Sequence, residues 1–152
     1  MTESLRIAVA ADHGGVALKA ALSEHLASEG HVVVDLGTDG TERVDYPDYG
    51  AAVGRAVASG QADLGVAVCG SGIGIGMAAN KVPGVRAATV HDETSARLAR
   101  QHNDANVLCL GERLVGVEVA RNALDAWLTA KFEGGRHAGR VAKLDALLTD
   151  RT

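Results

Sequence analysis

The sequence predicts an α/β fold in which a five-stranded parallel sheet is covered by helices on both faces. Short apolar runs alternate five times with stretches whose apolar residues recur at helical spacing, which is typical of consecutive strand–helix units. Aromatic residues make up only 3% of the chain, so Val, Ala, Leu and Ile have to form the core, as they do in buried parallel strands. A length of 152 residues fits a single domain spanning residues 1–152.

The first half of the chain supplies two of these units. Residues 5–10 (LRIAVA) predict a strand, and residues 16–28 continue with apolar side chains at helical spacing. Residues 31–36 (HVVVDL) predict the second strand, which a polar, turn-rich segment follows. Residues 48–59 then predict the second helix, which ends before Gly60.

The second half continues the alternation and adds a final helix. Residues 63–68 predict a third strand that runs directly into a glycine-rich turn and a short helix over residues 73–80. The remaining elements are a strand over 85–90, a helix over 92–101 with Asp92 as its N-cap, a strand over 106–110, and helices over 115–130 and 136–148 separated by Gly134-Gly135.

Charge and composition argue against several classes of function. A net charge of −4 argues against binding to nucleic acid or to an anionic membrane, because both need a basic face. No apolar run is long enough to span a bilayer, and the N-terminus lacks the basic and apolar regions of a signal peptide. Two cysteines do not make a disulfide framework. We therefore expect a cytoplasmic protein without nucleic-acid or membrane partners.

A glycine-rich loop follows the third strand. Gly70, Gly72, Gly74 and Gly76 alternate where the strand gives way to a helix, and glycines let a ligand approach the backbone closely. The dinucleotide and Walker patterns are excluded, because the last glycine of GxGxxG and the GK[ST] of the Walker loop are missing. Parallel sheets bind ligands beyond the carboxyl ends of their strands. The loop is therefore either a site for a small anion or oxyanion, or a tight structural turn.

Cys69 lies at the base of this loop. Near a helix N-terminus, a cysteine has its thiolate form favoured by the backbone donors. The alternative is a small buried apolar side chain, which is the role that we expect for Cys109 inside the fifth strand. The position of Cys69 makes it the better candidate of the two for chemistry.

Histidines occur near several ends of strands and helices. His102 is either a general acid–base or a surface residue near the end of a helix, and Asp12-His13 after the first strand has the same ambiguity. His13, His91 and His102 show no ligand spacing to a second histidine or to a cysteine, so no metal is predicted.

Arginines are concentrated toward the end of the chain. Arg113 follows the fifth strand, and Arg136 and Arg140 share one face of the last helix. The helical pair is either a phosphate clamp or a solvated basic face. Structural positions are expected for three other side chains, His25 and His31 at the surface and Trp127 in the core or at an interface.

Five segments match one family in its own order. They are ADHGG at 11–15, DYPDY at 45–49, CGSGIGIGMAANK at 69–81, RQHNDANVLCLGER at 100–113 and EGGRHAGRV at 133–141. Over residues 5–145 the chain resembles the type B ribose-5-phosphate isomerases, relatives of the galactose-6-phosphate isomerase subunits. The resemblance implies a Rossmann-like three-layer α/β/α sandwich. It also implies a homodimer or a dimer of dimers with active sites at the dimer interface, and a last helix, 136–148, that contacts the partner subunit.

The resemblance further implies a reaction, in which ribose 5-phosphate and ribulose 5-phosphate interconvert through a cis-enediolate without a metal or an organic cofactor. Cys69 would shuttle the proton between C1 and C2, and Ser71 would assist proton transfer to the oxygens. His102 would open the sugar ring, with Asp45 and Tyr46 lining that end. The implied binding residues are Gly70, Ser71, Gly72, Ile73, Gly74 and Asn103 for the enediolate oxygens, Asp12 for sugar hydroxyls, and His13, Arg113, Arg136 and Arg140 for the phosphate, some of them from the partner subunit.

One position distinguishes subgroups of the family. Some members replace the cysteine by serine and carry a glutamate base at the position of Ile75, so the chain resembles the cysteine-base subgroup. The galactose-6-phosphate isomerase subunits divide their catalytic residues between two different chains. Here the set is complete in one chain, which favours a self-sufficient homo-oligomer.

Two alternatives stay open at this point. The same chemistry could act on erythrulose 4-phosphate, allose 6-phosphate or galactose 6-phosphate, and Thr94, where relatives often have an aromatic residue, could reshape the sugar pocket. The chain could also be a non-catalytic sugar-phosphate-binding module. Cys69 and His102 argue against that module, because binding alone requires neither.

Overall fold

The computed structural model describes residues 3–149, and these contain one sheet of five parallel strands. The strand order is β2-β1-β3-β5-β4, and every neighbouring pair is parallel. The strands are β1 (Arg6–Ala11), β2 (Val32–Asp35), β3 (Leu64–Cys69), β4 (Ala87–Thr89) and β5 (Val107–Gly111). The predicted α/β fold with a five-stranded parallel sheet is confirmed.

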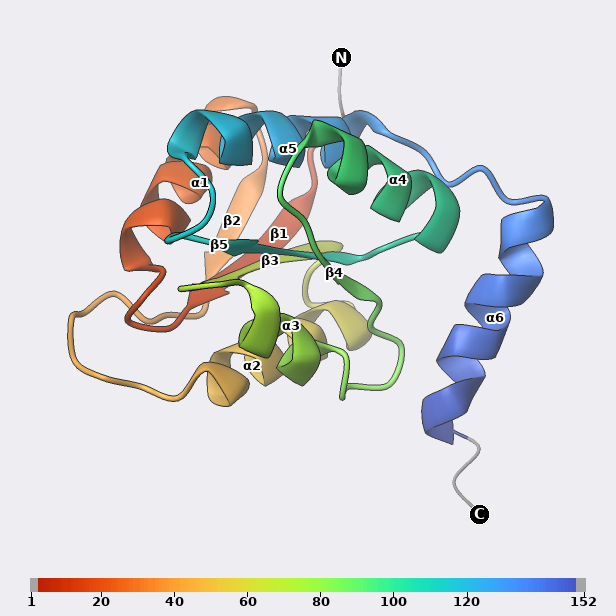
Figure 1. Cartoon of the computed structure of the whole chain (residues 1–152), viewed down its shortest axis with the longest axis horizontal. Helices are drawn as coiled ribbons and strands as arrows, with labels where there is room; N and C mark the ends of the chain where they lie inside the picture. The colour runs from red at the N-terminus through yellow and green to blue at the C-terminus, as the bar shows by residue number, and fades with distance from the viewer. Residues whose placement is uncertain (1–2, 150–152) are drawn as a thin grey trace.

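Helices cover both faces of the sheet and give the molecule three layers (Figure 1). Helices α1, α4 and α5 pack on one face, and α2 and α3 pack on the other. The helices are α1 (Val16–Ser28), α2 (Tyr46–Ala58), α3 (Ile73–Ala79), α4 (Glu93–Asn103), α5 (Val117–Thr129) and α6 (Arg136–Thr149). Within the described residues, no helix has the length and apolar character needed to cross a membrane.

Aliphatic side chains fill the spaces between the layers. On the α1 side, Leu22, Leu26 and Trp127 are fully buried, and the Trp127 indole Nε1 donates a hydrogen bond to the Ala105 carbonyl at 3.0 Å. This places Trp127 in the core. Cys109 is fully buried on the α2 side, as its position inside the fifth strand predicts.

Helix α6 lies beside the three layers rather than within them (Figure 1). Its Val141 is buried, and its Asp145 carboxylate pairs with the Arg86 guanidinium at 3.0 Å. Two leucines on the same helix remain exposed, Leu144 at 47% and Leu147 at 71%. The helix therefore presents an apolar surface that residues 3–149 leave uncovered.

The start of α2 and the end of α4 differ from the sequence-based expectation. Helix α2 begins at Tyr46, two residues early, because a proline at the next position fits the first helical turn, where its missing N–H costs nothing. Helix α4 extends through His102 and Asn103, which were expected after its end, and stops only at Asp104 with φ +46°. His102 is thus held by a helix rather than by a loop.

Two further expectations concern the sheet. His31 was expected at the surface, which is wrong: it is 9% exposed, and its Nδ1 accepts a hydrogen bond from the Leu5 amide at 3.2 Å. Strand β4 is only three residues long, because the Arg86 amide donates to the Asn106 side chain at 2.7 Å instead of extending the strand. The predicted N-cap at Asp92 is confirmed, since its Oδ1 accepts from the Ser95 amide at 2.7 Å.

The turn after β3 is pressed against the end of β5. A Cβ atom on Gly111 would lie 2.5 Å from the carbonyl carbon of Ser71, and one on Gly72 would lie 2.8 Å from that of Leu110. Gly72 also has φ +76°, in the left-handed region that disfavours other residues. Two glycines therefore fix how closely this loop approaches the sheet.

Replacing Gly111 by alanine should lower the free energy of unfolding by about 1–3 kcal/mol, because the loop has to move to accommodate a methyl group. Urea unfolding followed by circular dichroism, at one fixed protein concentration, measures this change. Gly40→Ala is the matched control, since its Cβ would meet no atom nearer than 4.0 Å. Equal unfolding free energies for the two variants would contradict this account of the packing.

Candidate active site

A pocket opens where the strand order reverses. Strands β1 and β3 are neighbours, but the chain leaves β1 toward β2 and leaves β3 toward the opposite edge, and such sheets bind ligands at that point. The pocket has a volume of about 550 Å³. It is lined by Asp12, Tyr46, Cys69, Gly70, Ser71, Ile73, Gly74, Met77, Arg113 and Leu114. We call it the Cys69 pocket.

Cys69 is the last residue of β3 and lies at the buried end of this pocket. Its side chain is 5% exposed, and its Sγ accepts a hydrogen bond from the Gly72 amide at 3.1 Å. This contact holds the sulfur beside the start of the glycine-rich loop. Burial and, to a smaller extent, the nearby Cys69 raise the pKa of the Cys109 thiol to about 12. Of the two cysteines, only Cys69 lines a pocket.

The loop after Cys69 is held from both sides while leaving amides unpaired. The Ser71 hydroxyl accepts from the Ile73 amide at 3.2 Å, and the Thr89 hydroxyl donates to the Gly72 carbonyl at 2.7 Å. Among residues 3–149, nothing accepts a hydrogen bond from the amides of Gly70, Ser71 and Gly74. Unpaired N–H groups beside a pocket can stabilise an oxyanion that forms in it.

Three side chains form the walls of the Cys69 pocket. Asp12 is 8% exposed, and its Oδ1 accepts from the Gly14 amide at 2.9 Å, which fixes the carboxylate. The Tyr46 ring covers Gly74 so closely that a Cβ there would lie 2.5 Å from the tyrosine Cε1. The Arg113 amide donates to the Gly70 carbonyl at 3.0 Å, and its side chain supplies positive charge to the pocket.

His13 and Asp45 are two of the predicted site residues that do not line the Cys69 pocket. His13 is exposed after β1, and its Nδ1 accepts a hydrogen bond from the Val44 amide at 3.2 Å, which leaves Nε2 as the protonated nitrogen of the neutral ring. Asp45 is exposed at the N-cap position of α2, although its side chain makes no capping hydrogen bond. Both belong to segments that adjoin the pocket through Asp12 and Tyr46.

Ile75 is fully buried in the core on the α2 side, so it presents no group to the pocket. The sequence-based argument that Cys69 is the only plausible base in the loop is compatible with this position. Met77 and Leu114 line the pocket and were not predicted, because a sequence gives an exposed apolar side chain no chemical signal.

His102 lies in a second group of side chains, which we call the His102 cluster: His102, Glu133 and His137. The rings of His102 and His137 stack with centroids 4.4 Å apart and planes 13° apart. Glu133 Oε1 lies 3.5 Å from His102 Nε2 and 3.8 Å from His137 Nε2. Burial, followed by the charge of Arg136, lowers the pKa of His137 and favours its neutral form.

Sequence reasoning missed Glu133 and His137 as members of this cluster. The Glu133 amide donates to the Gln101 carbonyl at 3.0 Å, which holds its segment against the end of α4. Gly134 and Gly135, with φ +65° and +52°, then turn the chain into α6. In the sequence, the glycine pair indicated a sharp turn. It did not indicate that this turn places Glu133 and His137 beside the end of α4.

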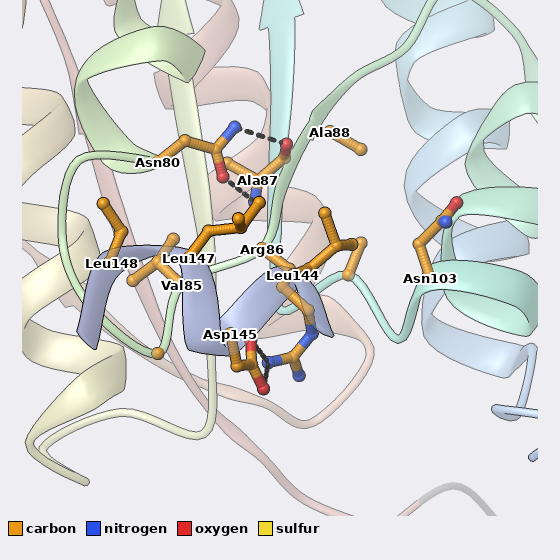
Figure 2. Close-up of a pocket in the computed structure, with 12 residues that line it drawn as sticks. Asn80, Val85, Arg86, Ala87, Ala88, Asn103, Leu144, Asp145, Leu147 and Leu148 are labelled. Atoms are coloured by element: carbon orange, nitrogen blue, oxygen red, sulfur yellow. Dashed lines mark hydrogen bonds and ion pairs between the residues drawn. The ribbon is translucent and has the colours of Figure 1, made fainter. Parts of the chain in front are cut away.

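Asn103 lines a different pocket of about 410 Å³, between β4 and α6 (Figure 2). Leu144 and Leu147 of α6 lie on one side of it, and the Arg86–Asp145 ion pair closes one end. The side chains of Arg136 and Arg140 are exposed on α6. Within one chain, four predicted site residues therefore do not line the Cys69 pocket: His102, Asn103, Arg136 and Arg140.

Comparison with known proteins identifies the family of the chain. Residues 7–144 match the family model described as Ribose/Galactose Isomerase. Ribose-5-phosphate isomerase B of Escherichia coli (strain K12) is 49% identical over 142 residues, which are 93% of this chain and 95% of that protein. The resemblance that the sequence motifs indicated is thereby confirmed.

Solved structures agree with the sequence comparison. Ribose-5-phosphate isomerase B of Clostridium thermocellum superposes with a TM-score of 0.95 at 49% identity, covering 97% of this chain and 99% of that one. Ribose-5-phosphate isomerase B of Mycoplasma genitalium, solved with bound ribulose-5-phosphate, gives a TM-score of 0.92 at 44% identity and covers 96% and 97% of the two chains. On this evidence the chain belongs to the ribose/galactose isomerase family.

Proposed function

We propose that this chain is a cytoplasmic aldose–ketose isomerase that interconverts ribose 5-phosphate and ribulose 5-phosphate, a reaction of pentose phosphate metabolism. The observation that carries the proposal is the position of the Cys69 thiol, at the buried end of a pocket beside unpaired backbone amides. The bound ribulose-5-phosphate of the Mycoplasma genitalium relative supports the substrate class.

In this mechanism the Cys69 thiolate removes the proton from C2 of the open-chain aldose. The electron pair of the C–H bond forms the C1–C2 double bond of a cis-enediolate, and the carbonyl oxygen takes the negative charge. The same thiol then returns the proton to C1, while a proton moves from O2 to O1 with help from the Ser71 hydroxyl. The product is the 2-ketose, and the thiolate is regenerated.

The loop amides supply most of the stabilisation that the enediolate needs. The amides of Gly70, Ser71 and Gly74 border the pocket, and removing one such donor in other enzymes costs about 3–4 kcal/mol. Because these donors are fixed before the reaction, they require little reorganisation when charge develops. The substrate hydroxyls would be held by the Asp12 carboxylate, which the Gly14 amide already orients.

Ring opening and phosphate binding involve groups beyond those that line the Cys69 pocket of one chain. We assign ring opening to His102, with Asp45 and Tyr46 at that end of the substrate, and oxyanion binding to Asn103 together with the loop. The phosphate would be bound by His13, Arg113, Arg136 and Arg140. Phosphate contacts away from the reacting carbons hold the substrate in position for proton transfer.

A second copy of the chain completes the site in this proposal. His102 and Asn103 do not line the Cys69 pocket of their own chain, so we assign them to the pocket of the partner, in a homodimer or a dimer of dimers. Exposed apolar side chains support the association, because Met77 and Leu114 beside the pocket are 63% and 57% exposed and Leu147 of α6 is 71% exposed. Association of two copies would remove such surfaces from water.

The alternative function keeps the chemistry and changes the sugar. A relative from Pectobacterium atrosepticum that is 42% identical over 141 residues is a D-erythrulose-4-phosphate isomerase, which favours including four-carbon substrates. Allose 6-phosphate and galactose 6-phosphate are the six-carbon candidates. Thr94 lies with Asp92 and Val119 in a separate shallow pocket rather than in the Cys69 pocket, so it has no direct contact with the proposed base.

Replacing Cys69 by alanine should lower kcat/KM for ribose 5-phosphate by at least about 10³-fold, because no other group in the loop can carry the proton. A coupled assay of ribulose 5-phosphate formation measures the loss, and calorimetry with ribose 5-phosphate should show retained binding. Cys109→Ala is the matched control, since that thiol is fully buried in the sheet. Near-normal turnover by Cys69→Ala would rule out the proposed base.

Replacing His102 by alanine should harm cyclic substrates more than acyclic ones. Ribose 5-phosphate is mostly cyclic, whereas erythrose 4-phosphate cannot close a five-membered ring because its O4 is esterified. We expect a loss of about 10²–10⁴-fold on the former and a much smaller loss on the latter, each measured relative to the unsubstituted protein. Equal losses on both substrates would remove the ring-opening role.

A further inference from the structure

Three side chains with metal-binding atoms converge in the His102 cluster. His102 lies in the last turn of α4, Glu133 lies in the segment between α5 and α6, and His137 lies in the first turn of α6. Their ligand atoms all lie within 4.8 Å of one another. The sequence conceals this group, because more than thirty positions separate His102 from the other two.

The distances within the cluster suit a shared cation better than direct hydrogen bonds. Glu133 Oε1 is 3.5 Å from His102 Nε2 and 3.8 Å from His137 Nε2, beyond the usual hydrogen-bond range. Ligands about 2.0–2.1 Å from a tetrahedral zinc ion lie about 3.3 Å from one another. Shortening these distances by a few tenths of an ångström and turning the His102 ring would therefore convert the cluster into a coordination sphere.

An unsatisfied buried atom gives independent support. His137 is 6% exposed, and its Nε2 is buried without a hydrogen-bond partner among the described residues. Buried polar atoms in native proteins nearly always have a partner, which can be a bound ion. Because His137 Nε2 faces Glu133 and His102, the missing partner belongs in the space between these three side chains.

The backbone holds two of the ligands before any ion arrives. The Glu133 amide is bonded to the Gln101 carbonyl at 3.0 Å, and the His137 amide is bonded to the Gly134 carbonyl at 2.9 Å. The third ligand, His102, has 35% of its side chain exposed and can therefore turn. It has to tilt out of its stack on His137, since parallel rings direct their Nε2 lone pairs along separate planes.

We propose that His102, Glu133 and His137 form a binding site for Zn²⁺ or a similar divalent transition metal, with the fourth position open to water. Two imidazole nitrogens and one carboxylate oxygen are a known ligand set for zinc, whereas Mg²⁺ and Ca²⁺ prefer oxygen ligands alone. The ion would bind the His102 nitrogen that ring opening needs. Metal binding therefore inhibits the enzyme, a consequence that rests on the proposed function while the site itself does not.

Direct binding tests the site without reference to activity. Chelator-treated protein is titrated with Zn²⁺ by calorimetry and with Co²⁺ by visible absorption, which reports tetrahedral coordination. We expect one ion per chain in the unsubstituted protein. Glu133→Gln and His137→Asn should each weaken binding by at least about tenfold. The glutamate is largely exposed, so its variant is not expected to disturb folding.

His25→Asn is the matched control, because His25 is half-buried outside the His102 cluster and pairs with the Asp125 carboxylate at 2.7 Å. Its affinity for zinc should equal that of the unsubstituted protein. Absence of zinc binding, or an affinity of Glu133→Gln and His137→Asn equal to that of the unsubstituted protein, would overturn the site. Zinc binding that leaves the turnover of ribose 5-phosphate unchanged would overturn the proposed inhibition. If the protein binds zinc but has no isomerase activity, the metal site stands and the proposed function is contradicted.

Discussion

The close contact between the turn after β3 and the end of β5 is the constraint on which the proposed catalytic site depends. Gly72 and Gly111 leave no space for a Cβ atom, so the loop from Gly70 to Gly74 lies directly on the sheet. That position directs the Gly72 amide toward Cys69 Sγ and, among residues 3–149, leaves neighbouring amides without partners. The thiol that we propose as the base and the amides that we propose as oxyanion donors thus lie side by side before any substrate binds, and such preorganisation is an effective source of catalysis.

The Cys69 pocket and the His102 cluster are held in place by different parts of the structure. The Cys69 pocket is built from strand ends and the first turns of helices packed on the sheet. The His102 cluster instead depends on how the segment before α6 folds back on the end of α4, and α6 lies beside the three layers (Figure 1). Because α6 lies outside the three layers, the cluster at its start can face another chain. In the account proposed here, the terminal helix therefore links oligomerisation to catalysis.

Much of the fold followed from the sequence because strand–helix alternation is a local signal. The motif containing Cys69 was also predictable, since a strand, a cysteine and spaced glycines are adjacent along the chain. His31 was misjudged because its burial comes from packing and from the Leu5 amide, which no local pattern encodes. Glu133 and His137 were missed as partners of His102 because only the turn at Gly134 and Gly135 brings them together.

In the proposed dimer, each active site takes its base from one chain and His102 from the other. To test this sharing, Cys69→Ala and His102→Ala chains are mixed, unfolded and refolded together, and assayed for ribose 5-phosphate isomerisation. In a mixed dimer one of the two sites keeps both residues, so random pairing predicts recovery of about one quarter of the unsubstituted activity. Activity no greater than the sum of the two separate variants would contradict the claim.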